Sequence, residues 1–203
     1  YDLMRGLRGG EPWLLMEQSA SAVCQWTVNA PKQPGMLRLG SYQAIAHGSD
    51  SVMFFQWRAS RAGYEKFHSA MLPHGGPTTR GFQEVAALGR ELPRVSAVVG
   101  GRIRSDVALL WDFDAWAALE GPAHPLNNLS YAGIALDHYR PLWRANFATD
   151  VASPADDLSV YRLVVVPSLY LVTDACRAAL REYVEGGGHL VVSWFSGMVD
   201  EDD

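Results

Sequence analysis

The chain has 203 residues, of which 48% are hydrophobic and 19% are charged. A disordered chain would be far more polar, and this length is sufficient for one large or two small domains, each with its own core. The formal net charge is -5 and no run of lysines or arginines occurs. This excludes nucleic acid as the main partner, because phosphate binding requires a basic face.

Cysteine usage and hydropathy bear on the compartment. Cys24 and Cys176 lie far apart and in no metal-ligand spacing, which favours a reducing environment without a disulfide framework. No apolar stretch approaches the roughly 20 residues of a membrane span, and the opening residues lack the apolar core of a signal peptide. We therefore expect a cytoplasmic protein with no membrane partner. Because the chain starts without Met and runs straight towards a strand, we expect it to be a segment of a longer protein.

The first predicted strand lies in PWLLMEQSAS, where an apolar run from Trp13 to Met16 ends on Glu17. A continuous apolar run is typical of a strand that is buried on both faces of a parallel sheet. The C-terminal ends of such strands are where (β/α)8 barrels place their chemistry. Glu17 is therefore a candidate catalytic carboxylate, and the alternative is a strand-end glutamate that points into solvent.

One pattern then repeats along the first half of the chain. A polar loop from 18 to 35 leads to a helix that ends at His47-Gly48, as expected for a glycine stop. The apolar strand in SVMFFQWRAS, residues 51–60, is followed by a polar loop and a second helix over 81–92. Strand, loop and helix in this order, with polar residues after each strand, indicate two βα units of a parallel sheet.

The second half predicts another α/β domain after a junction at 93–105, which contains Gly100-Gly101. Its first strand covers 107–111, and a long helical region follows, capped by Asn127 or Asn128 and interrupted at Pro141.

The remaining elements of this half are a strand at Leu163–Val166, a helix capped by Thr173 or Asp174, a glycine-rich turn and a strand at His189–Trp194. We expect a doubly wound domain that stops before its sheet is complete. The glycines at 186–188 lack the spacing and the following Lys-Ser/Thr of a phosphate loop, so they more simply end a helix before a strand.

In a barrel, the side chains that follow the first two strands would surround one pocket. They are a carboxylate, aromatic rings and hydrogen-bonding groups: Glu17, Trp26, Phe55, Gln56, Trp57, Arg58, Glu65 and His68. Aromatic faces contact the apolar C–H face of a sugar, and Glu and His bond its hydroxyls. A retaining glycosidase would need a second carboxylate about 5–5.5 Å from the first.

Purely structural interpretations remain open for some of these residues. Trp57 could pack in the core, Arg58 could form a structural ion pair, and Glu65 with His68 could be a surface helical pair. The other histidines form no ligand spacing: His47, His74, His124, His138 and His189.

Three stretches carry a resemblance to a known family. They are PWLLMEQSAS, the segment VNAPKQPGMLRLGSYQAIAHGSDSVMFFQWRASRAGYEKFH, and DVALLWDFDAW. The chain resembles glycoside hydrolase family 42, the β-galactosidases, along almost its whole length. The resemblance implies the last two βα units of a (β/α)8 TIM barrel over 1–95, followed by an incomplete α/β trimerisation domain of flavodoxin-like or amidotransferase-like shape over 106–203.

The resemblance also implies roles for individual residues. Glu17 matches the catalytic nucleophile, which must be ionised, so hydrogen-bond donors should keep its pKa low. Trp26 and Phe55 match aromatic walls of the galactose site, and Glu65 and His68 match the pair that bonds the galactose hydroxyls. The implied reaction is hydrolysis of terminal non-reducing β-D-galactose residues with retention, through a covalent glycosyl-enzyme.

Other family features would lie outside this sequence. The acid/base, a Glu that follows an Asn, belongs to a strand before Tyr1, and the zinc-binding cysteines of some members are also missing, so no cofactor is expected here. The implied partners are a β-galactoside substrate and further subunits of a homotrimer. The chain alone should be inactive, since it carries one carboxylate of the two.

The alternative is a non-catalytic oligomerisation module of a sugar-processing enzyme. An amidotransferase-like outline also raises the question of a cysteine nucleophile. Cys176 lies near the start of a predicted amphipathic helix without a matched histidine, whereas a nucleophile elbow requires a tight strand-to-helix turn. A cysteine-nucleophile enzyme is therefore rejected, and the non-catalytic oligomerisation module remains as the alternative.

Overall fold

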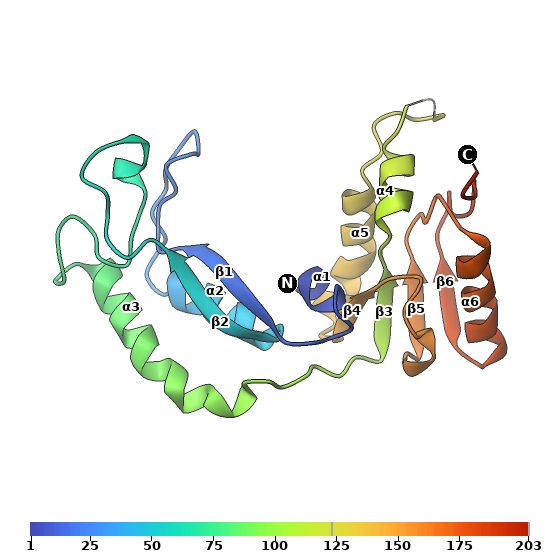
Figure 1. Cartoon of the computed structure of the whole chain (residues 1–203), viewed down its shortest axis with the longest axis horizontal. Coiled ribbons are helices and arrows are strands. Elements are labelled where there is room, and N and C mark those ends of the chain that lie inside the picture. The colour runs from blue at the N-terminus through green and yellow to red at the C-terminus, as the bar shows by residue number, and fades with distance from the viewer. Residues whose placement is uncertain (123, 203) are drawn as a thin grey trace. The chain divides into compact units, whose positions relative to one another are not determined.

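The computed structural model describes residues 1–122 and 124–202. Its contacts divide it into two compact units (Figure 1). One unit is Pro12–Arg102, and the other combines Tyr1–Glu11 with Ile103–Asp203. Each unit contains its own parallel sheet. No helix among the described residues is long and apolar enough to cross a membrane.

The unit Pro12–Arg102 holds two βα units, as predicted. Strands β1 (Trp13–Ser19) and β2 (Ser49–Phe55) pair in parallel. Helix α2 (Met36–Ala46) joins them, and helix α3 (Arg80–Glu91) follows β2. Two 3-10 helices complete the unit, η1 (Tyr64–Phe67) in the loop after β2 and η2 (Leu92–Val98) after α3.

Only one face of the β1–β2 sheet is covered within the described residues. Ala20, Leu37 and Leu88 form the buried cluster between this face and the helices. On β1, Leu14 is 53% exposed and Met16 is 71% exposed. The prediction of a first strand buried on both faces is therefore wrong for this chain. The apolar run reflects a strand with two apolar faces, and the second face has no covering element here.

The other unit is a doubly wound α/β sheet. Its strands are all parallel in the order β4-β3-β5-β6. Counted along the chain this order is 2-1-3-4, which is the beginning of the flavodoxin-like order. The strands are β3 (Val107–Leu110), β4 (Thr149–Ala152), β5 (Leu163–Val166) and β6 (His189–Val192).

The helices of this unit are α1 (Asp2–Gly6), α4 (Phe113–Leu119), α5 (Tyr131–Arg144), the 3-10 helix η3 (Leu158–Val160) and α6 (Asp174–Glu185). Of the two predicted caps of α6, Thr173 is the one observed, since its hydroxyl accepts the Cys176 N–H at 3.1 Å. The core cluster of this unit includes Leu110, Val164 and Leu169, which are almost fully buried.

The long helical region differs from the prediction in three ways. Ser130 caps α5 by accepting from the Gly133 N–H, so neither Asn127 nor Asn128 is the cap. The helix also continues through Pro141 to Arg144. Pro141 lies in the last turn of the helix, so the single helical hydrogen bond that it removes is near the C-terminal end. The separate helix α4 was missed.

Candidate active site

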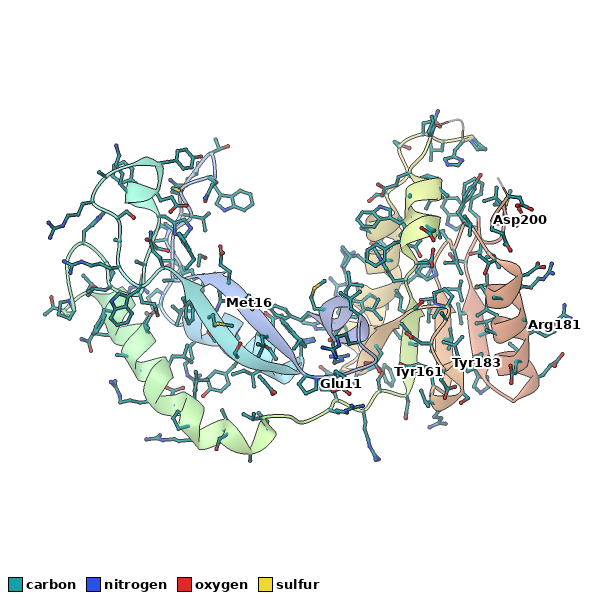
Figure 2. All side chains as sticks on the ribbon, in the orientation of Figure 1. Glu11, Met16, Tyr161, Arg181, Tyr183 and Asp200 are labelled. Atoms are coloured by element: carbon teal, nitrogen blue, oxygen red, sulfur yellow. The ribbon has the colours of Figure 1, made fainter. Side chains whose placement is uncertain are left out.

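The C-terminal ends of β1 and β2 meet at one edge of their sheet, and the loops after both strands leave from this edge (Figure 1). The pairing is irregular just before it, because Leu15 pairs with Val52 and the next pair is Gln18 with Phe54. One extra residue of β1 therefore bulges in the segment of Met16 (labelled in Figure 2) and Glu17. Bulges of this kind re-aim side chains and are frequent beside active sites.

Glu17 is an exposed residue of β1 in this bulge. Within residues 1–122 and 124–202 its carboxylate forms no hydrogen bond or ion pair. Burying such a group without partners would be costly, whereas an open carboxylate can receive a substrate.

Phe55 is the last residue of β2 and is the register partner of Ser19, two residues after Glu17. Its ring packs edge-to-face against the ring of His68, with 5.1 Å between the centroids. Two of the predicted site residues are thus in direct contact, and both lie close in register to the strand that carries Glu17.

Glu65 and His68 lie on and directly after η1, where the His68 N–H donates to the Glu65 carbonyl at 2.9 Å. His68 is 6% exposed, whereas Tyr64 is 77% exposed and Phe67 is 70% exposed. The turn therefore directs His68 inwards and presents its aromatic neighbours to solvent. This burial does not fit a surface helical pair.

A serine bridge holds the His68 segment against the loop after β1. The His68 Nδ1 atom lies 2.9 Å from the Ser69 carbonyl oxygen. The Ser69 N–H donates to the Ala22 carbonyl, and the Ser69 hydroxyl accepts the Ser21 N–H at 2.7 Å. Sequence reasoning missed Ser69, because a single serine in a polar loop gives no signal of a contact with a residue 48 positions away.

Trp26 is 70% exposed on the loop after β1. Lys32 fixes the returning end of this loop, since its ammonium donates to the Ser19 carbonyl at 2.5 Å and its N–H donates to the Ser21 hydroxyl at 3.0 Å. Burial lowers the pKa of Lys32. The Arg80 guanidinium also donates to the Lys32 carbonyl. The base of the loop is therefore held by several hydrogen bonds, whereas the Trp26 side chain is exposed.

The residues just after Phe55 show mixed environments. Trp57 is 65% exposed, which excludes the core-packing interpretation for the described chain. The Gln56 Nε2 atom is buried without a hydrogen-bond partner among the described residues, and its Oε1 atom accepts from the Ser60 hydroxyl at 3.3 Å. The described residues contain no group of three or more His, Cys, Asp or Glu that could hold a metal ion.

Cys176 is buried on α6, and burial raises the pKa of its thiol to about 11. A nucleophilic cysteine requires a lowered pKa and an accessible position. The structure therefore agrees with the rejection of a cysteine nucleophile.

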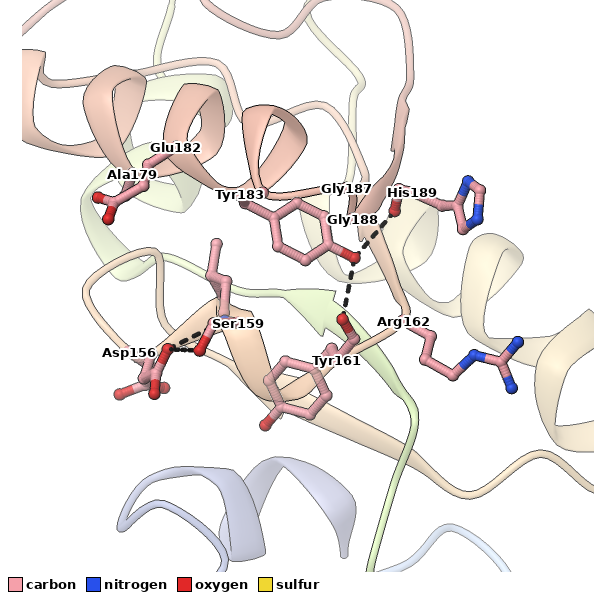
Figure 3. Close-up of a pocket in the computed structure, with 13 residues that line it drawn as sticks. Asp156, Ser159, Tyr161, Arg162, Ala179, Glu182, Tyr183, Gly187, Gly188 and His189 are labelled. Atoms are coloured by element: carbon pink, nitrogen blue, oxygen red, sulfur yellow. Dashed lines mark hydrogen bonds between the residues drawn. The ribbon is translucent and has the colours of Figure 1, made fainter.

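The other unit contains a cavity of about 530 Å³ beside the start of β6 (Figure 3). The buried Tyr183 hydroxyl lies within hydrogen-bond distance of the Tyr161 and His189 carbonyls, at 3.3 and 3.2 Å. A Cβ on Gly188 would lie 2.2 Å from the Tyr183 ring. The glycine turn is thus a tight α6-to-β6 connection, as predicted.

Comparison with protein-family models gives two matches that together cover nearly the whole chain. Residues 1–95 match the family described as "Beta-galactosidase", and residues 105–203 match the "Beta-galactosidase trimerisation domain".

Individual relatives agree with these models. "Beta-galactosidase BgaB" from a Geobacillus species is 48% identical over 203 residues, which is 100% of this chain and 30% of the relative. "Beta-galactosidase LacZ" from Heyndrickxia coagulans is 44% identical, again over 100% of this chain and 30% of the relative. The chain thus spans about 30% of the length of these curated relatives.

Solved structures give the same result. The β-galactosidase from Bacillus circulans matches with a TM-score of 0.96 and 39% identity, over 99% of this chain and 30% of that one. The cold-adapted β-galactosidase from Rahnella matches with a TM-score of 0.96 and 41% identity, over 100% of this chain and 30% of that one.

Proposed function

The chain belongs to glycoside hydrolase family 42, the β-galactosidases, and from this membership we propose that it is part of an enzyme that hydrolyses terminal non-reducing β-D-galactose residues with retention. The observation that supports this most directly is Glu17. It is an exposed carboxylate, without an internal partner among the described residues, at the end of the strand where a barrel places its chemistry.

In the proposed reaction the Glu17 carboxylate attacks the anomeric carbon, and the bond from that carbon to the leaving oxygen breaks. An acid carried by another part of the protein gives a proton to the leaving oxygen. A covalent glycosyl-enzyme results, and water then attacks the same carbon and releases Glu17. Two displacements at one carbon retain the anomeric configuration.

The neighbouring side chains would hold the sugar. The Phe55 and Trp26 rings offer apolar faces to its C–H surface, and Glu65 with His68 would bond its hydroxyls. The Phe55–His68 contact supports this assignment, because it makes one wall of an aromatic ring and a hydrogen-bonding ring.

Assembly and location complete the proposal. The matched trimerisation domain supports a homotrimer, and we place the protein in the cytoplasm. The domain division would be 1–95 for the end of the barrel and 106–203 for the trimerisation domain. The acid/base and any zinc site would belong to parts of the enzyme outside this sequence.

A second function is favoured for the 203 residues by themselves. They carry a candidate nucleophile without an identified acid/base, so alone they would act only as an oligomerisation module. Retaining hydrolysis needs both carboxyl groups.

The test uses the full-length protein and an activated 2-deoxy-2-fluoro-galactoside, followed by peptide mass mapping. We expect the label on the peptide that holds Glu17, and we expect Glu17→Gln to abolish it. Glu185→Gln, which changes an exposed carboxylate at the end of α6, should label like the natural protein. Rapid labelling of another residue, with Glu17 unmodified, would overturn the assignment.

A further inference from the structure

Ser69 joins the two loops that leave the C-terminal ends of β1 and β2 (Figure 1). Both loops belong to the unit Pro12–Arg102. The Ser69 hydroxyl accepts the Ser21 N–H at 2.7 Å, and the Ser69 N–H donates to the Ala22 carbonyl at 3.0 Å. Two hydrogen bonds therefore cross between the loops at this one residue, and only the first depends on its side chain.

A cavity beside this bridge makes the bridge important for the spacing of the loops. The cavity has a volume of about 350 Å³, and its lining includes Ser21 and Ala22 from one loop and His68 and Ser69 from the other. Close packing is interrupted at a cavity, so the side chains around it lose dispersion contacts. The spacing of the loops at this point therefore depends on the hydrogen bonds between them.

On the β1 side, the hydrogen bonds continue to the end of the strand. The Ser21 hydroxyl accepts the Lys32 N–H at 3.0 Å, and the Lys32 ammonium donates to the Ser19 carbonyl at 2.5 Å. Ser19 is the last residue of β1 and lies two residues after Glu17. A series of hydrogen bonds inside one unit thus links Ser69 to the strand that carries the proposed nucleophile.

On the β2 side, the backbone of Ser69 determines which nitrogen of His68 is available. The Nδ1 atom of His68 lies 2.9 Å from the Ser69 carbonyl oxygen. A carbonyl oxygen only accepts hydrogen bonds, so Nδ1 carries the hydrogen and Nε2 of the neutral ring is an acceptor. Among the residues that the structure describes, Nε2 has no hydrogen-bond partner. A sugar hydroxyl could therefore donate to it.

The Phe55 ring holds the imidazole from a second direction. It packs edge-to-face on the His68 ring, and Phe55 is the register partner of Ser19. The contacts therefore return to the end of β1 and form a closed circuit, which consists of Ser19, Lys32, Ser21, Ser69, His68 and Phe55.

We infer that Ser69 is a positioning residue for His68. Its hydroxyl holds the loop after β2 on the loop after β1, and so sets the place of the His68 ring relative to the strand end of Glu17. Its carbonyl leaves Nε2 as the acceptor for a galactose hydroxyl. This inference rests on the proposed function, because it takes His68 as a galactose contact.

The test is a double-mutant cycle in the full-length protein, with Ser69→Ala, His68→Ala and the double variant. We would measure kcat/KM for a nitrophenyl β-galactoside and confirm folding by thermal unfolding. The matched control is Ser193→Ala. The Ser193 hydroxyl, directly after β6, also accepts the N–H of a residue distant in sequence, Ser168, at 2.8 Å.

We expect Ser69→Ala to lower kcat/KM about three- to tenfold, the effect of one lost hydrogen bond. In the His68→Ala protein the same change should lower it less than about twofold, because the ring that Ser69 positions is then absent. A general loosening of the loops would instead lower kcat/KM in both backgrounds. Ser193→Ala should match the natural protein.

Equal losses in the two backgrounds, or an unchanged kcat/KM for folded Ser69→Ala, would overturn the inference. If Ser69→Ala does not fold, Ser21→Ala takes its place in the cycle with the same expectation, because it removes the next link, to Lys32. If His68→Ala itself leaves kcat/KM unchanged, or the natural protein is not labelled on Glu17, the proposed function is overturned, and the inference with it.

Discussion

The two histidines of the loop after β2 differ in burial, and this difference separates the roles that we expect for them. His68 and His74 lie in the same loop, yet His68 is buried against Phe55 while His74 is exposed and bonds the Ser60 carbonyl at 2.7 Å. Sequence spacing alone could not separate these two histidines. Only the resemblance in the EKFH segment distinguished His68, and the structure adds a physical difference.

We predict that His68→Ala lowers kcat/KM of the full-length enzyme for a galactoside by about tenfold or more, the effect of losing a hydrogen bond made to the substrate. His74→Ala should change it less than about twofold, because the exposed ring bonds only a loop carbonyl. Steady-state kinetics on both variants checks this. Equal losses would argue against a substrate contact at His68.

The buried thiol of Cys176 makes a prediction for alkaline pH. Its pKa is raised from the usual 9.0 to about 11. The raised pKa means that stability is fully present below pH 9 and is lost as the pH rises through 11, up to about 2–3 kcal/mol. Cys176→Ala should therefore lose less stability between pH 9 and 11 than the natural protein in thermal unfolding. Cys24→Ala, a change at a half-exposed site, is the control.

Among secondary-structure elements, the strongly patterned ones were predictable and those stabilised by tertiary contacts were not. The apolar runs of β1, β2, β3 and β5 and the cap of α6 were all evident in the sequence. Strand β4 was missed because TDVA is short and polar, and it is held by pairing with β3. Helix α1 was missed because it has only five residues and the buried Arg5 side chain pairs with Asp150, which is far away in the sequence.

For the candidate site, the strand end of Glu17 and the loop residues could be predicted, but the β-bulge and the Ser69 bridge could not. Both depend on contacts between segments far apart in the chain.

Replacement of two glycines by alanine should change the free energy of unfolding in opposite directions. A methyl group on Gly188 would overlap the Tyr183 ring, so Gly188→Ala should destabilise by about 1–3 kcal/mol. A methyl group on Gly89 meets nothing within 4 Å on α3, so Gly89→Ala should stabilise by about 0.5–1 kcal/mol. Thermal unfolding of the two variants measures both. The same sign for both would contradict the packing described for the α6–β6 turn.

The chain as a whole joins two segments that match two models of one family, residues 1–95 and 105–203. At this scale the two-carboxylate mechanism makes a clear prediction for the 203 residues alone. They should show no turnover of a nitrophenyl galactoside, because the second displacement needs a base to activate water and the proposed acid/base is not among these residues. Measurable turnover that Glu17→Gln abolishes would show that a second acid lies within this chain.

The exposed face of β1 offers a chemical probe of barrel formation, the side chain of Met16. Met16 is 71% exposed, and a methionine sulfur in that position is readily converted to the sulfoxide by peroxide. If further barrel strands cover this face in the full-length enzyme, the same sulfur becomes shielded. The oxidation rate of Met16 would then report barrel closure during folding, without any engineered label.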